Sequence, residues 1–91
     1  MKTVFIKVYG KVQGVFFRQA TIAKAKELNI TGYTLNARDG TVEIMAQGTR
    51  ENIEALIAWS HHGPERARVD KVDVKEVEEK NSFRSFELRY P

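Results

Sequence analysis

Two glycines and an arginine are spaced along VYGKVQGVFFR, residues 8–18, in a way that suits phosphate binding. Gly14 can adopt backbone angles that other residues avoid, so several N–H groups of the following turn can point toward one centre. Arg18 carries a guanidinium group whose parallel donors match two oxygens of a phosphoryl group. A helix that begins here would add the positive end of its dipole. The segment therefore predicts a site for a terminal phosphoryl group.

A plainer interpretation of this segment is a tight turn between a strand and a helix, with Arg18 in solvent. Isolated glycine patterns often occur by chance, and the GK[ST] run that closes a Walker loop is missing. Asn36 is a second polar candidate, because its amide both donates and accepts hydrogen bonds and can hold a water molecule. Taken alone, Asn36 is more typical of a polar residue that enters a hairpin turn.

Hydrophobic periodicity predicts the elements that must position these residues. Residues 3–9 alternate between apolar and other side chains, which is typical of a strand with one buried face. A helix is predicted to begin directly after the glycine loop and to end near Asn29. The residues at helical spacing are Phe17, Thr21, Ala25 and Leu28. Residues 30–37 and 41–47 are strand-like, and a hairpin turn at 38–40 joins them.

A second helix is predicted between Thr49, a good N-cap, and the pair Gly63–Pro64. Alternation returns near residues 71–75 and again at 86–90, which indicates further strands. The order is βαββαβ with room for a short final strand. It predicts an α+β sandwich of the ferredoxin-like type, an antiparallel sheet with two helices on one face. We expect residues 1–91 to form a single domain.

Composition limits the classes of function that need to be considered. The chain has 91 residues, no cysteine and a net charge of +3, so disulfides and thiolate chemistry are excluded and small anions are favoured. The first residues alternate and do not form an apolar run, and no stretch is long enough to cross a membrane. We therefore expect a cytoplasmic protein without membrane association.

The two histidines do not have the spacing of a metal site. His61 and His62 are adjacent, so on a helix their side chains point about 100° apart. A helical pair of ligands is four residues apart. We expect no metal and no cofactor.

The sequence resembles the acylphosphatases, small enzymes that hydrolyse acyl phosphates. Residues 8–18 meet every fixed position of the first signature of that family, and residues 32–48 resemble its second half, with Asn36 in place. Thr34 stands where the family usually has alanine, valine or cysteine, and Leu35 where it mostly has a basic residue. Strand alternation places Leu35 on the face opposite Asn36, away from the site. The similarity extends through residues 59–72 and 83–90.

The resemblance implies an acylphosphatase domain in which Arg18 binds phosphate and Asn36 positions the attacking water. The phosphate-binding residues that it implies are Gln13, Gly14, Val15, Phe16, Phe17 and Arg18. The substrate would be a small-molecule acyl phosphate, and inorganic phosphate or sulfate would occupy the site as an anion. The leaving group is a carboxylate that is stable near neutral pH, so a metal-independent reaction without a strong general acid is expected.

Three alternatives compete with this prediction. RNA-recognition domains share the βαββαβ order but place aromatic residues on the third strand. The residues that alternate with the apolar ones there are Thr41, Glu43, Met45 and Gln47, so we expect no nucleic acid partner. A non-catalytic anion-binding module of the same fold is the second alternative. The third is a domain of a larger maturation protein with a carbamoyl-phosphate-related reaction, but the length of the chain favours a free-standing enzyme, which we expect to be a monomer.

Overall fold

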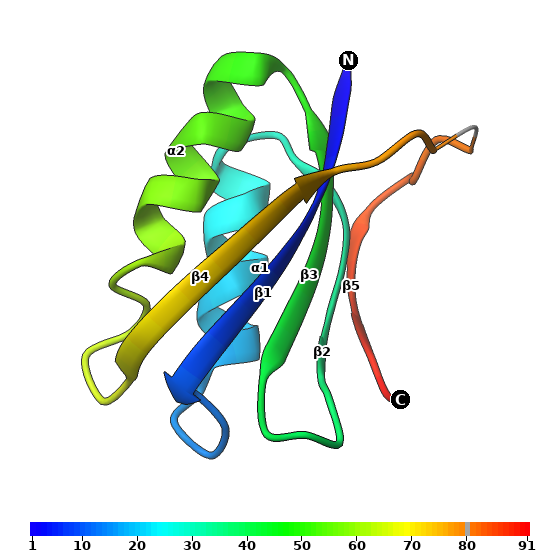
Figure 1. Ribbon diagram of the computed structural model, residues 1–91. Helices are drawn as coiled ribbons and strands as arrows, with labels where there is room; N and C mark the ends of the chain where they lie inside the picture. Colours follow the sequence, from blue (N-terminus) through cyan, green and yellow to red (C-terminus); the bar gives the residue numbers. More distant parts are fainter. Residues whose placement is uncertain (80) are drawn as a thin grey trace.

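The computed structural model describes residues 1–79 and 81–91. Its elements are β1 (Lys2–Lys11), α1 (Phe17–Glu27), β2 (Thr31–Asn36), β3 (Val42–Gly48), α2 (Arg50–Ser60), β4 (Arg68–Glu76) and β5 (Phe86–Arg89). The strands form one sheet in the order β4-β1-β3-β2-β5, and both helices cover the same face of it (Figure 1). The predicted α+β sandwich of the ferredoxin-like type is confirmed. Within the described residues, no helix is long and apolar enough to span a membrane.

The final strand requires a correction to the expected antiparallel sheet. The pairs β1–β3, β1–β4 and β2–β3 are antiparallel, but β5 runs parallel to β2, so the sheet is mixed. The chain after β4 crosses the end of the sheet where β2 starts. There the Gln47 side chain donates to the carbonyl oxygen of Asn81 at 3.2 Å and accepts from the N–H of Phe83 at 3.1 Å. Because β5 enters from that same end, it must run in the direction of β2.

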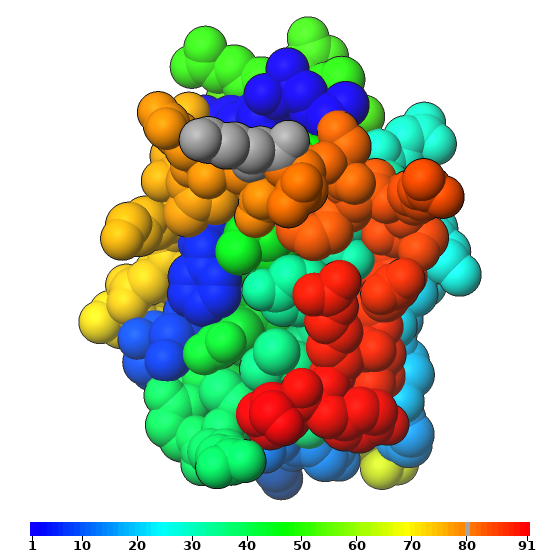
Figure 2. Space-filling view, turned by 90° about the vertical axis from the view of Figure 1, so that its right-hand side faces the viewer, coloured from blue at the N-terminus to red at the C-terminus, as the bar shows by residue number. Residues whose placement is uncertain are grey.

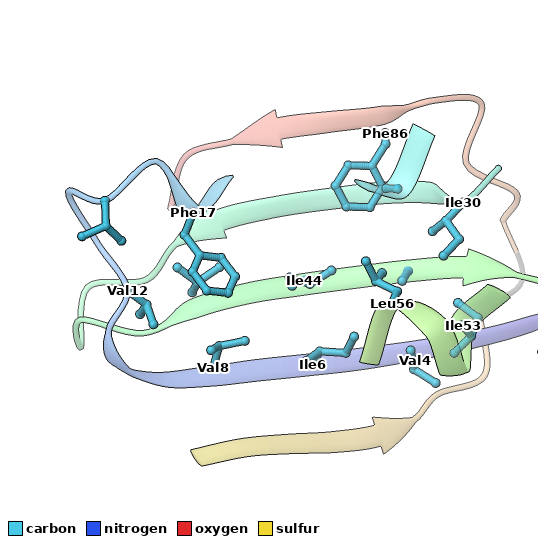
Figure 3. Packing of buried hydrophobic residues seen from close by; sticks show 14 residues of the cluster. Val4, Ile6, Val8, Val12, Phe17, Ile30, Ile44, Ile53, Leu56 and Phe86 are labelled. Carbon is cyan, nitrogen blue, oxygen red and sulfur yellow. The ribbon is translucent and has the colours of Figure 1, made fainter. Parts of the chain in front are cut away.

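The hydrophobic core lies between the sheet and the helices. Alternate residues of β1 and β3 point into it, and each is at most 1% exposed: Val4, Ile6, Val8, Val42, Ile44 and Ala46. Ile53 and Leu56 of α2 pack on them, and Phe17 lies over the other end of the sheet (Figure 3). The Phe17 ring also lies 5.5 Å from that of Trp59. Burial of Phe17 therefore fixes where α1 begins, directly after the glycine loop, as the periodicity predicted.

The helix and hairpin boundaries follow local hydrogen bonds. The Thr49 hydroxyl accepts from the N–H of Asn52 at 3.2 Å, so the predicted N-cap of α2 is confirmed. The strands of the hairpin are one residue shorter at the turn than predicted. Ala37 belongs to the turn, where its N–H donates to the carbonyl oxygen of Thr41 at 2.9 Å. Asn36 is consequently the last residue of β2.

Candidate active site

The loop of residues 12–16, here called the cradle loop, joins β1 to α1 at the end of the sheet where the β2–β3 turn and the C-terminus also lie (Figure 1). Two of its residues have left-handed backbone angles, Gly14 with φ 75° and Phe16 with φ 64°. Such angles are ordinary for glycine but rare and strained for an aromatic residue. Phe16 is the N-cap of α1, so the strain is located where the helix begins.

The first turn of α1 has hydrogen-bond donors without partners. The first bond of the helix runs from the N–H of Ala20 to the carbonyl oxygen of Phe16, at 3.1 Å. No side chain caps the helix, and its first turn has no acidic residue. Within the described part of the chain, the N–H groups of Phe17, Arg18 and Gln19 have no acceptor. Free N–H groups and the positive end of the helix dipole together favour an anion.

These donors open onto a cavity of about 310 Å³. Its lining residues are Val12, Gly14, Phe16, Phe17, Arg18, Gln19 and Asn36. Five of the residues predicted from the sequence are thus brought together, although Asn36 is far from the others along the chain. Val12 and Gln19 were not predicted, and their only signal was that they lie within or next to the glycine motif.

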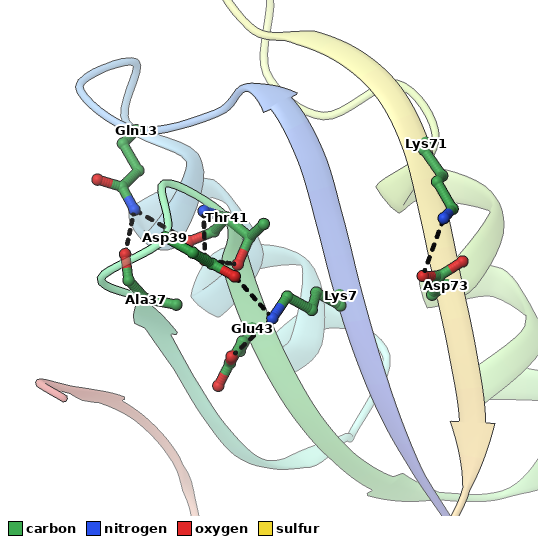
Figure 4. Close-up of polar contacts among 8 residues, drawn as sticks. All are labelled: Lys7, Gln13, Ala37, Asp39, Thr41, Glu43, Lys71 and Asp73. Atoms are coloured by element: carbon green, nitrogen blue, oxygen red, sulfur yellow. Dashed lines mark hydrogen bonds and ion pairs between the residues drawn. The ribbon is translucent and has the colours of Figure 1, made fainter.

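Two of the predicted residues do not line the cavity. The side chain of Val15 is only 4% exposed and belongs to the hydrophobic core. The side chain of Gln13 points to the β2–β3 turn, where its amide nitrogen donates to the carbonyl oxygens of Ala37 and Thr41 (Figure 4). Any contribution of these two residues to anion binding must therefore come from their backbone.

Asn36 carries an unusual polar atom. Its side-chain oxygen Oδ1 is buried and has no hydrogen-bond partner among the described residues. Leaving a buried acceptor unpaired costs about 1–3 kcal/mol, so such groups call for an explanation. Asn36 is also one of the residues that line the cavity, so its side-chain amide lies beside the space where a water molecule or ligand would bind.

Arg18 is half-buried on the same cavity and makes no ion pair within residues 1–79 and 81–91. The centre of its guanidinium group lies 5.8 Å from the centre of the Tyr90 ring, near the C-terminus. An aromatic neighbour leaves the charge of an arginine uncompensated and restricts its motion. The positive charge of Arg18 therefore remains available to an anion.

Thr34 and Leu35, the two departures from the expected family pattern, lie away from these groups. Thr34 is fully buried, and its hydroxyl donates to the carbonyl oxygen of Glu43 at 3.0 Å. Leu35 lines a separate hollow beside Pro91, on the opposite face of the sheet from Asn36. The alternation predicted for this strand is confirmed.

A charged network stiffens the turn after Asn36 (Figure 4). Asp39 accepts from the N–H and the hydroxyl of Thr41, at 3.1 and 2.6 Å, and pairs with Lys7 at 2.9 Å. The Thr41 hydroxyl, followed by Lys7, holds the pKa of Asp39 well below its ordinary value. The hydrogen bond with Asp39 raises the pKa of Lys7. This network was not predicted, because Lys7 comes from a strand distant in sequence.

Comparison with known proteins identifies the family. The family model described as Acylphosphatase matches residues 4–88. The chain belongs to the acylphosphatase family. An acylphosphatase of Methylococcus capsulatus is 44% identical over 86 residues, which cover 94% of each chain. An acylphosphatase structure from Coxiella burnetii is 39% identical, with a TM-score of 0.92 over 97% of this chain and 92% of that one. The structure from Bacillus subtilis is 29% identical, with a TM-score of 0.95 over 99% and 100%.

Membership of the acylphosphatase family gives the activity. The protein is an enzyme that hydrolyses the carboxyl–phosphate bond of acyl phosphates, which are small-molecule substrates. The non-catalytic alternative is therefore set aside. Figure 2 shows the face of the sheet without helices. Two cations lie near tyrosine rings of the sheet, with Lys71 5.0 Å from the ring centre of Tyr9 and Arg89 4.2 Å from that of Tyr33.

Proposed function

We propose that the cradle loop and Arg18 bind the phosphoryl group of the acyl phosphate. The backbone N–H groups from Gln13 to Phe17, continued by those of the first turn of α1, would surround its oxygens. Arg18 would pair with two of them. The free N–H groups of the first turn and the unpaired charge of Arg18, on one cavity, support this assignment. Both kinds of donor would neutralise and orient the charge that is spread over the phosphoryl oxygens in the transition state.

We propose that Asn36 positions the water molecule that attacks phosphorus. The observation that carries this proposal is the buried, unpaired Oδ1 of Asn36 on the same cavity as Arg18. The Asn36 amide would hydrogen-bond the water and direct a lone pair of the water toward phosphorus. Because a neutral amide cannot take a proton, an oxygen of the substrate phosphate would receive it. The water oxygen bonds to phosphorus, the bond from phosphorus to the acyl oxygen breaks, and carboxylate and inorganic phosphate leave.

We propose that the reaction needs neither a metal nor a general acid. A carboxylate has a pKa of about 4, so it leaves as a stable anion at neutral pH without protonation. Neutralisation and orientation of the phosphoryl group are the main requirements of phosphoryl transfer, and backbone donors with one arginine meet them.

We further propose that the protein is a cytoplasmic monomer whose residues 1–91 form a single acylphosphatase domain, and that inorganic phosphate or sulfate binds at the site. One sheet includes every strand of residues 1–79 and 81–91, which supports the domain assignment. Large exposed apolar side chains are scattered over different segments, which supports a monomer. They are Met1, Phe16, Val74 and Tyr90. Light scattering coupled to size-exclusion chromatography tests the monomer.

The decisive experiment is hydrolysis of benzoyl phosphate by the purified protein in EDTA, with Asn36→Ala measured in parallel. Turnover that persists in EDTA and depends on Asn36 is expected. Turnover lost in EDTA and restored by a divalent cation would contradict the metal-independent mechanism. Full activity of a folded Asn36→Ala variant would contradict the role of this residue.

A further inference from the structure

Gln13 has a side-chain contact that binding of the phosphoryl group does not use. Its amide nitrogen donates to the carbonyl oxygen of Ala37 at 2.8 Å and to that of Thr41 at 3.0 Å. The donor comes from the cradle loop, and both acceptors lie 24 or more residues later, at the two ends of the β2–β3 turn. In Figure 4 the amide oxygen points away from both carbonyls, so the nitrogen makes the connection.

The acceptors of Gln13 are already part of the turn that follows Asn36. The N–H of Ala37 donates to the carbonyl oxygen of Thr41 at 2.9 Å, and the N–H of Gly40 donates to that of Ala37 at 3.2 Å. A carbonyl oxygen can accept two hydrogen bonds, so Gln13 adds a second bond to each. The cradle loop is thereby bonded to both sides of the turn. One of the two acceptors, Ala37, directly follows Asn36.

Within residues 1–79 and 81–91, these are the two hydrogen bonds that connect the cradle loop with the hairpin. The phosphate-binding groups lie on the loop side of this connection and Asn36 lies on the hairpin side. We propose that Gln13 is a positioning residue, which sets the location of the Asn36 amide relative to the bound phosphoryl group. The inference rests on the proposed roles of the cradle loop and of Asn36.

A residue with this role acts on the chemical step more than on binding. The donors proposed to hold phosphate are backbone N–H groups of residues 13–19 and the guanidinium of Arg18, so a change in the Gln13 side chain alone removes none of them. The direction from which the water attacks phosphorus would change, because it depends on the cradle loop, which holds the phosphoryl group, and on the hairpin, which carries Asn36. A misplacement of about 1 Å can lower a rate about 100-fold. The expected signature is a lower kcat at nearly unchanged substrate and phosphate affinity.

Gln13→Met tests the inference, since methionine keeps the length of the side chain and removes both donors. We expect kcat for benzoyl phosphate to fall about 10- to 100-fold, with KM and the inhibition constant of inorganic phosphate within about 3-fold of wild type. Gln47→Met is the matched control, because Gln47 connects segments at the opposite end of the sheet. Its kcat should equal that of wild type at a temperature where both proteins are folded.

Gln13→Glu provides an independent readout if Gln13→Met fails to fold. Its carboxylate has no donor and repels the two carbonyl oxygens, but protonation restores one O–H donor. The ratio of its kcat to that of wild type should therefore rise as the pH falls from 7 toward 4. A wild-type kcat in either folded variant, or a ratio that does not change with pH, overturns the inference. Full activity of a folded Asn36→Ala variant would instead overturn the proposed role of Asn36 on which the inference rests, so the two failures are distinguishable.

Discussion

At each end of the sheet a glutamine side chain connects neighbouring segments through hydrogen bonds. The two ends differ in how many of their buried polar groups have a hydrogen-bond partner. At one end Gln47 is 5% exposed and uses its whole amide. It donates to the hydroxyl of Thr3 and the carbonyl oxygen of Asn81, and accepts from the N–H of Phe83. At the other end Gln13 makes two hydrogen bonds, but the buried Oδ1 of Asn36 has no partner among the described residues.

This difference separates a structural end from a functional end. The contacts of Gln47 hold the chain that leads into β5, and they leave no group of that amide for a ligand. At the cradle end, the described residues leave without partners the N–H groups of the first turn of α1, the guanidinium of Arg18 and the buried Oδ1 of Asn36, and all of these residues line one cavity. Unpaired polar groups lower stability, and enzymes retain them where substrate completes the hydrogen bonds. Mutations at the two ends should therefore affect different measurements.

Arg18→Ala is expected to give the largest effect on activity. Loss of the guanidinium removes the charged donors of the phosphoryl group, so kcat/KM should fall at least about 100- to 1,000-fold. Stability should change by less than about 0.5 kcal/mol, because Arg18 makes no ion pair with the residues that the structure describes. Steady-state kinetics and urea unfolding measure the two quantities. A variant that keeps more than about a tenth of wild-type kcat/KM would contradict the assignment.

Asn36→Ala should lower kcat about 100-fold while the affinity for inorganic phosphate changes little, because water is misplaced and the anion site persists. The substitution also removes the buried, unpaired Oδ1. The free energy of unfolding is therefore expected to stay the same or rise, by up to about 1 kcal/mol. Equal, mild losses of phosphate affinity and of turnover would count against a role in placing water.

Gln47→Leu should reverse this pattern at the opposite end of the sheet. It removes three hydrogen bonds, two donated and one accepted, and should lower the free energy of unfolding by about 2 kcal/mol. Turnover per folded molecule should be unchanged, because the cradle loop is at the other end. Unfolding curves and single-temperature kinetics check both parts. A large loss of kcat in the folded variant would show that the two ends are coupled.

Asp39→Asn should give the smallest effect, and one that depends on pH. The pKa of Asp39 is lowered from its ordinary value of 3.8 by Thr41 and Lys7. A carboxyl group with a lowered folded-state pKa adds stability above pH about 4 and loses it as the pH falls toward that lower value. Its side chain is 53% exposed, so screening by solvent keeps the contribution small.

Thermal unfolding of wild type and Asp39→Asn between pH 7 and pH 2 measures this contribution. The difference in Tm should be largest near neutral pH and should shrink on acidification. A difference that stays constant over this range would mean that the ionised carboxylate of Asp39 has no specific partner in solution.

The sequence predicted those parts of the site whose signals are local. Periodicity located both helices, and the glycine spacing before Arg18 predicted the loop at the start of α1. Residue type and the family resemblance indicated Asn36. The lack of a partner for its Oδ1 could not be predicted, because it depends on which groups surround this atom in space. The side-chain role of Gln13 was missed because its partners lie 24 and 28 residues away. The direction of β5 was missed because it depends on where the preceding loop crosses the sheet.

The position of Tyr90 has a practical consequence for handling the enzyme. Its ring lies 5.8 Å from the guanidinium of Arg18, so a segment fused after Pro91 would begin one residue from this contact. The N-terminus lies at the opposite end of the sheet (Figure 1), and Met1 is 94% exposed. An affinity tag, a fluorophore or a surface linker for immobilisation therefore belongs on Met1, where it leaves substrate entry free.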